Sequence, residues 1–241
     1  MKKIIATIAA IAAFVAASAQ NFDYNNGIEL KEGSRVKTSL KVLFPMQFGM
    51  TTLLNTTYNS TAMKLLESEE ILKTSLPKSF FYSLELLGVN FSSENGPFEV
   101  NIGVRMSFLD LAFAKPDYTF TELGGTVIPS YIKLMSPEYD SNKSKVHGTY
   151  IGIPVRFIYN IDKVQLHLGA SAEYLIKGYT KYKNPPTRND LPNLFNSFRA
   201  TVEGGITYGI IGLYANYGLT PVFNTELSNA NTLTIGLSLL L

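Results

Sequence analysis

Five charged side chains lie in stretches of alternating sequence whose other polar positions are mostly small or uncharged: Arg105, Arg156, Glu173, Arg199 and Glu203. Side chains of a strand alternate between its two faces, and these five fall on the face opposite the apolar residues. If that face lines a closed interior, each charge must be paired, because an unpaired buried charge is costly. Two interpretations follow: a path for ions or substrate, or a structural Arg–Glu network that fills the interior. We predict the network, because eight-stranded barrels leave little interior room beyond their own side chains.

The two histidines of the chain, His147 and His167, are the other candidates for chemistry. Neither belongs to a metal-ligand motif, and the absence of cysteine excludes thiolate sites. A lipid hydrolase would need a Ser–His pair oriented by a third group, and Ser141 and Ser144 precede His147. We predict no catalytic, cofactor-binding or metal-binding residues and therefore no enzyme, with an outer-membrane lipid-modifying enzyme as the weaker alternative.

The stretch from Thr149 to Lys177 reads as two long strands joined by a tight turn at residues 160–163. A turn centred between Ile161 and Asp162 would place Arg156 opposite His167 and Glu173 opposite Tyr150. Arg156 and Glu173 are then not direct partners across the two strands. The candidates across the interior are Glu203 and Arg105 for Arg156, and Arg199 for Glu173.

Eight alternating stretches predict eight strands, and the connections between them are long and short in turn. The first strand is expected over about 38–54, with Pro45 at a bulge, and the second over 79–91, with a bulge near Gly88 that reconciles its two apolar phases. A short amphipathic helix is expected over 62–73. The order of connections predicts an all-β, antiparallel up-and-down barrel that crosses a membrane, with long extracellular loops and short periplasmic turns.

The composition of the polar face decides between a membrane barrel and a soluble, lipocalin-like ligand-binding barrel. A surface facing water should be rich in Lys and Glu, whereas this face is mostly Gly, Ser, Thr, Asn and Gln. The apolar face carries tyrosines towards its strand ends, as an interfacial girdle does: Tyr159, Tyr174, Tyr208 and Tyr217. We therefore predict that the apolar face meets lipid, and keep the soluble barrel as the alternative.

The N-terminus has the order of a secretory signal: two lysines, an apolar run over 4–17, and a small-residue cleavage site at Ala19. We predict a signal peptide over 1–19, a periplasmic segment over 20–36 and the barrel over 37–241, located in the outer membrane after export. The net charge of +2 gives no reason to expect a nucleic-acid partner.

Most of the mature chain resembles the PorT-like outer-membrane β-barrel proteins of Bacteroidetes. The resemblance rests on IGIPVRFIYNI and VQLHLGASAEYLIKG, on two glycine-punctuated strands after them, and on the closing NTLTIGLSLLL. It implies an eight-stranded outer-membrane barrel that contacts outer-membrane lipid. It also implies possible partners in the envelope or in a protein-secretion system, with no small-molecule substrate identified.

The long loops contain further candidates for contact with protein or glycan: Tyr118, Phe120, Tyr131 and Tyr139 in one loop, and Lys181, Lys183 and Arg188 in the next. Functional residues concentrate on loops held by a rigid scaffold. The same side chains could instead pack over the mouth of the barrel. The sequence leaves both interpretations open.

Overall fold

The structure, a computed structural model, describes residues 28–29, 36–41, 45–93, 96–135, 137–138, 143–183 and 186–239. The predicted signal peptide over 1–19 and most of the predicted segment over 20–36 lie outside the described residues. In the described part of the chain, no helix is long and apolar enough to cross a membrane.

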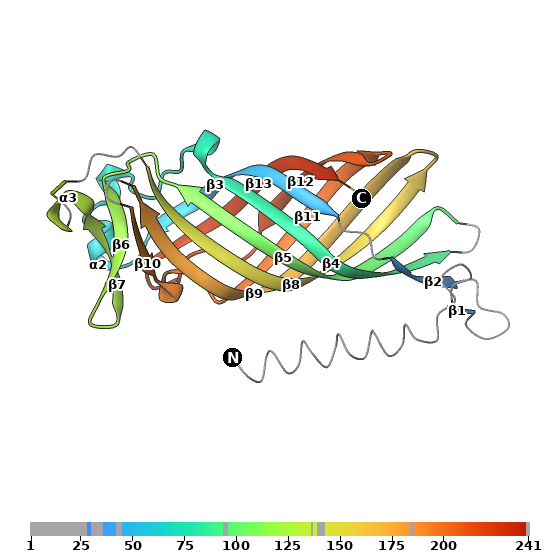
Figure 1. The fold of residues 1–241 in the computed structure, drawn as a ribbon, viewed down its shortest axis with the longest axis horizontal. Coiled ribbons are helices and arrows are strands. Elements are labelled where there is room, and N and C mark those ends of the chain that lie inside the picture. Colours follow the sequence, from blue (N-terminus) through green and yellow to red (C-terminus); the bar gives the residue numbers. More distant parts are fainter. Residues whose placement is uncertain are drawn as a thin grey trace.

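Eight antiparallel strands close into a barrel (Figure 1). They are β3 (Met46–Tyr58), β4 (Phe80–Ser93), β5 (Phe98–Ala112), β8 (Ser144–Ile161), β9 (Val164–Tyr182), β11 (Phe198–Tyr208), β12 (Ile211–Gly218) and β13 (Ser228–Leu239). Strands that follow one another along the chain pair with one another, and β13 pairs with β3 to complete the ring. Each of the eight described barrel strands is thus paired on both sides, which is the condition for a sheet to exist in lipid.

The connections separate the two ends of the barrel, as the sequence predicts (Figure 1). We call the end with the long connections the loop end and the end with the tight turns the turn end. The loop end holds α2 (Thr61–Lys64), η1 (Glu67–Glu69), η2 (Leu76–Lys78), the hairpin of β6 (Tyr118–Leu123) and β7 (Thr126–Tyr131), α3 (Ile132–Met135), β10 (Thr187–Asp190) and η3 (Pro192–Leu194). The turn end holds β1 (Ile28–Glu29) and β2 (Val36–Lys41). The helix expected over 62–73 is wrong in its length, because only the short α2 and η1 form there.

The first strand of the barrel is built in two parts. Strand β2 pairs with residues 88–93 of β4, and β3 pairs with residues 80–84, so the two follow one another along the same neighbour. Pro45 lies at the break, where its missing N–H interrupts the ladder. Its carbonyl accepts a hydrogen bond from the Glu85 N–H at 3.1 Å.

A bulge in β4 reconciles the two apolar phases of that strand. Its pairing with β5 shifts between Glu85 and Leu87, which leaves Leu86 without a partner. The bulge therefore lies two residues before Gly88, close to the predicted position. It keeps Glu85 on the inside while Phe91 further along is exposed.

The register of β8 and β9 differs by two residues from the predicted one. Ile161 pairs with Val164, so Arg156 faces Gly169 and Glu173 faces Gly152. The turn contains only Asp162 and Lys163, with Asp162 at φ 52°. Two-residue turns suit the twist of paired strands, and aspartate tolerates this left-handed backbone. A shift of two residues keeps the predicted faces from Tyr150 to Tyr159 and from Val164 to Tyr174. The irregularity between Thr149 and Tyr150 turns Lys177, which simple alternation places inside, to the outside opposite Thr149.

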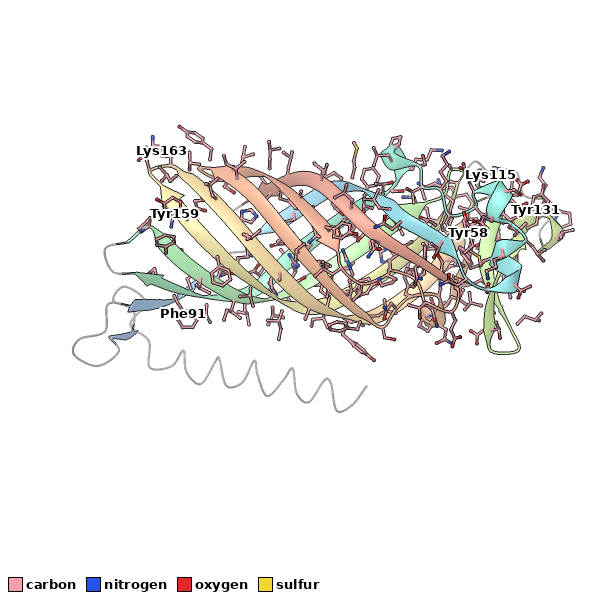
Figure 2. All side chains as sticks on the ribbon, turned by 180° about the vertical axis from the view of Figure 1, so that it is seen from behind. Tyr58, Phe91, Lys115, Tyr131, Tyr159 and Lys163 are labelled. Carbon is pink, nitrogen blue, oxygen red and sulfur yellow. The ribbon has the colours of Figure 1, made fainter. Side chains whose placement is uncertain are left out.

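The exterior of the barrel is apolar and the interior is polar over the half nearer the turn end. Phe157, Leu168 and Ile235 on the outside are 62%, 67% and 62% exposed, whereas Thr201, Asn216 and Thr234 inside are 1% exposed or less. A soluble lipocalin-like barrel has the opposite arrangement, so that alternative is wrong. Figure 2 shows Tyr159 at the turn end of this apolar exterior, where an interfacial aromatic residue is expected.

The alternation inverts towards the loop end. In β5, Leu109 and Leu111 point inward and are fully buried, while Asp110 between them points outward. In β8 the outward residues change from Ile151 to Thr149 and then to the charged end of the strand. From Ile151 to Tyr159 the apolar side spans about 26 Å along the strand at ~3.3 Å per residue. Strand tilt reduces this to about 20 Å, near the ~25 Å apolar band of membrane barrels. The strands therefore extend beyond the membrane, and their interior becomes apolar where their exterior meets water.

The membrane assignment makes a prediction for two exposed leucines. Leu168 on the barrel exterior and Leu134 on α3 are 67% and 83% exposed. Leu168→Arg should destabilise the barrel in liposomes, lowering its free energy of unfolding by about 2–4 kcal/mol, because it places a charge against lipid. Leu134→Arg should fold like the parent chain, because that residue faces water. Equal tolerance of both changes in a urea titration would contradict a lipid-facing exterior.

Candidate functional site

Arg105 lies at the centre of the charges inside the barrel. It comes from β5, is fully buried, and donates through Nη1 to Glu203 Oε2 at 2.7 Å and through Nη2 to Glu173 Oε1 at 3.1 Å. Its Nη1 also contacts the Gln47 side-chain oxygen at 3.3 Å. One guanidinium thus links carboxylates from β9 and β11 across the interior, a geometry that its planar donors favour.

Arg156 joins the same group from β8. It donates to Glu203 Oε1 through Nε and to Glu85 Oε2 through Nη1. Glu203 is one of its predicted candidates, whereas Arg105 is only a neighbour bound to the same carboxylate. Glu85 is absent from the sequence-based group of five. With Glu85 included, three arginines meet three glutamates, so the formal charges balance.

Glu85 could have been found from the sequence. Leu84 and Leu86 flank it, and both would face lipid if the first part of β4 kept a single phase. That phase places Glu85 inside, where it is 1% exposed. The missed signal was therefore the alternation of β4 before the bulge, which places Glu85 inside the barrel.

Glu173 and Arg199 form the side of the network nearer the loop end. Glu173 accepts from Arg199 Nη1 at 3.2 Å, from Ser107 Oγ at 2.9 Å and from Ser171 Oγ at 3.3 Å. Arg199 was its expected partner. The Arg199 guanidinium carbon also lies 5.1 Å from the ring centre of Phe81 and 5.5 Å from that of Tyr150. Arg199 therefore marks the boundary between the charged layer and an apolar layer.

The apolar layer closes the loop end from inside. It combines inward strand residues with side chains from all four long connections: Ile71 and Leu72, Phe113 and Phe120, Leu194 and Phe195, and Val222 and Phe223. Three of these connections meet around Phe223, whose ring centre lies 6.2 Å from Phe120 and 6.1 Å from Phe195. The long loops are thus fixed to the barrel by a common core.

The aromatic and basic loop residues for which the sequence left two interpretations open divide between this core and the surface. Phe120 is 2% exposed and belongs to the core, and Tyr118 packs against it. Tyr131 is 37% exposed and touches Tyr118 edge to face. Lys183 and Arg188 are surface residues. Tyr139 lies outside the described residues.

A polar cavity opens near the turn end. Its volume is about 100 Å³, and its lining includes Glu85, Arg156, His167, Asn90 and Asn101. His167 Nε2 is buried without a hydrogen-bond partner in the described part of the chain. The space suits a few water molecules, and it borders Arg156, which is bound to Glu85 and Glu203.

His147 lies on the outer surface of β8. Its Nδ1 is 2.8 Å from Asp110 Oδ1, and its Nε2 is 3.1 Å from Thr149 Oγ1. Ser144, which the enzyme alternative would pair with it, is fully buried at an inward position of the same strand. That Ser–His pair is therefore excluded, and Ser141 lies outside the described residues. The described residues contain no cluster of three or more His, Asp or Glu side chains suited to a metal ion.

The interior thus has a neutral ionic layer and an apolar layer in series, within a barrel whose exterior is made for lipid. This combination defines a transmembrane β-barrel whose described interior is filled. The sequence profile of the family described as "Outer membrane protein beta-barrel domain" matches residues 18–224, so the chain belongs to this family. The protein is an outer-membrane β-barrel protein.

Several solved structures resemble the chain, among them the following two. One is the crystal structure of Neisserial surface protein A (NspA), with 10% identity, a TM-score of 0.42, and coverage of 83% of this chain and 98% of that chain. The other is the crystal structure of Ail, the attachment invasion locus protein of Yersinia pestis, with 10% identity, a TM-score of 0.36, and coverage of 83% and 97%. No curated protein sequence matches the chain significantly.

The ionic layer predicts a large stability effect from one arginine. Arg156→Ala should leave Glu85 and Glu203 short of a counter-charge and lower the unfolding free energy in detergent by about 3–5 kcal/mol. Lys115→Ala is the control, because it breaks an exposed ion pair with Glu69 at 2.6 Å. Exposed pairs contribute little.

The partner of Arg156 can be identified by a double-mutant cycle. Adding Glu85→Ala to Arg156→Ala should recover part of the loss, because it removes the carboxylate left alone. An Arg156→Ala protein as stable as the Lys115→Ala protein would refute the ionic layer.

Proposed function

We propose that this protein is a non-enzymatic, closed outer-membrane barrel that serves as an anchor or a component of a surface or protein-export assembly. The observation that carries the proposal is the filled interior, in which the Arg–Glu layer and the apolar layer at the loop end lie one after the other along the barrel axis. A barrel filled in this way offers its loops and exterior for function, and not a path through its centre. The proposal includes export by the signal peptide over 1–19 and membership of the PorT-like group of Bacteroidetes.

The loop end supplies surfaces for such an assembly. The hairpin of β6 and β7, α2 and α3 stand at this end (Figure 1), and exposed leucines lie in the hairpin, at the C-cap of α2 and in α3. Leu65, Leu123 and Leu134 are 77%, 71% and 83% exposed. Apolar side chains on a water-facing surface support contact with a protein partner. The core beneath holds the loops in place and reduces the entropy lost on binding.

The assembly role predicts a stable partner. Tagged protein purified from native outer membranes in mild detergent should carry a partner in fixed stoichiometry, measured by native electrophoresis and quantitative mass spectrometry. Leu65→Asn combined with Leu134→Asn should reduce the partner's yield, because both side chains would be desolvated in the complex. The control is Leu65→Met with Leu134→Met, which keeps the apolar surface.

Two results would contradict this function. A barrel that always migrates alone, with the same recovered proteins as an unrelated tagged barrel, would refute the assembly role. Steady, large single-channel conductance of the purified protein in planar bilayers would show that the interior is open and that the protein is a pore.

A further inference from the structure

Four cations lie on the outward side of the barrel above its apolar exterior; three of them are solvent-accessible, and Lys145 is nearly buried. We call Lys145, Lys177, Lys181 and Arg188 the cationic face. They come from β8, β9 and β10, and the pairing of the strands places them side by side: Lys145 faces Lys181, and Lys181 faces Arg188. Asp110, Lys143, Lys181 and Lys78 all lie close enough to Lys145 to interact with it electrostatically.

The height of the cationic face follows from the register of β8 and β9. The outward pair Ile151 and Tyr174 belongs to the apolar exterior, and the next outward pair is Thr149 and Lys177. Successive outward pairs are ~7 Å apart along a strand, so cations begin about 7 Å beyond the last apolar pair. This is the depth of the headgroup region, which adds roughly 5–7 Å to each side of the hydrocarbon core. The loop end makes it the outer leaflet.

Aromatic rings hold these cations in position. The Arg188 guanidinium carbon lies 3.7 Å from the ring centre of Tyr179, whose ring stacks on His147 at 4.6 Å. Lys145 Nζ lies 5.5 Å from the ring centre of Phe80, and the residue is only 5% exposed. Charged side chains fixed by stacking lose less entropy when they bind an anion.

Carboxylates neutralise only part of this charge. Asp110 lies 3.6 Å from Lys181 and 2.8 Å from His147, and Asp190 lies 3.3 Å from Arg188. Among the residues that the structure describes, no carboxylate lies within salt-bridge distance of Lys145 or Lys177. The face therefore keeps a net positive charge.

The opposite side of the barrel has no counterpart. Strands β3, β11, β12 and β13 contain two charged residues, Arg199 and Glu203, and both point inward. Their outward residues near the loop end are uncharged, such as Asn55, Thr57 and Asn229. Among the described barrel strands, the outward cations near the loop end are thus confined to β8 and β9.

We propose that the cationic face binds the phosphate of an anionic lipid headgroup in the outer leaflet, with the lipid's chains lying on the apolar exterior below. The charge is complementary to phosphate, the depth is that of headgroups, and the apolar surface continues directly from the site. Clusters of Lys and Arg at a membrane surface attract anionic lipid in this way. The site rests on the outer-membrane location and is independent of any assembly partner.

Titration of the detergent-solubilised barrel with phosphatidylglycerol, followed by native mass spectrometry, tests the site. Lys181→Gln combined with Arg188→Gln removes two cations that are 39% and 48% exposed, so folding is preserved. This variant should bind phosphatidylglycerol roughly tenfold more weakly or worse. Asp190→Asn removes a negative charge from the same face and should tighten binding.

The control is Lys64→Gln with Lys163→Gln, which removes the same charge from α2 and from the β8–β9 turn, where both residues are exposed. It should bind phosphatidylglycerol like the parent chain. Equal losses in the two double variants would overturn the proposal, as would equal binding of phosphatidylcholine and phosphatidylglycerol. Complete displacement of the lipid by millimolar inorganic phosphate would also overturn it, because the site would then select a free anion.

Discussion

Charge neutrality inside a closed barrel is the constraint on which the rest of the structure depends. Arg105 lies where solvent cannot reach it, and its charge is tolerable only because Glu173 and Glu203 reach it from across the interior. Those carboxylates are shared with Arg199 and Arg156, so each of the two carboxylates links its own strand to two others. The layer ties β4, β5, β8, β9 and β11 together at one level. A barrel fixed in this way is a rigid support for its loops.

The second organising feature is the reversal of sidedness along the strands. Where lipid surrounds the barrel, apolar residues face out and the ions lie within. Where the strands rise into water, Leu109 and Leu111 turn their apolar side chains inward and Asp110 faces out. The same period of two serves both environments, because only the identity of the two faces changes. This reversal creates the core that anchors the loops, and it places the cationic face beside the apolar exterior.

The sequence predicted the barrel, the strand faces and the ends on which the connections lie, because alternation depends only on neighbours along one strand. It did not predict features set by contacts between strands. Glu85 was missed because the bulge in β4 hides its phase, and the turn at Asp162 shifted the register by two residues. Asp110 and His147 lie 37 residues apart, so nothing local indicated their contact. The loop-end core was also hidden, because apolar loop residues such as Phe120 suit a buried core and a binding surface equally well.

A scan of nitroxide labels along β8 tests the central claim, the facing of the strands and the point at which it reverses. The chain has no cysteine, so single cysteines can be introduced and labelled without background. In liposomes, labels at outward positions from Ile151 to Tyr159 should be relaxed by oxygen dissolved in lipid, with a maximum near Val155. Labels at Lys145 and His147 should be relaxed by a water-soluble nickel complex instead. Oxygen accessibility at the inward positions, or nickel accessibility throughout the outward ones, would contradict the account.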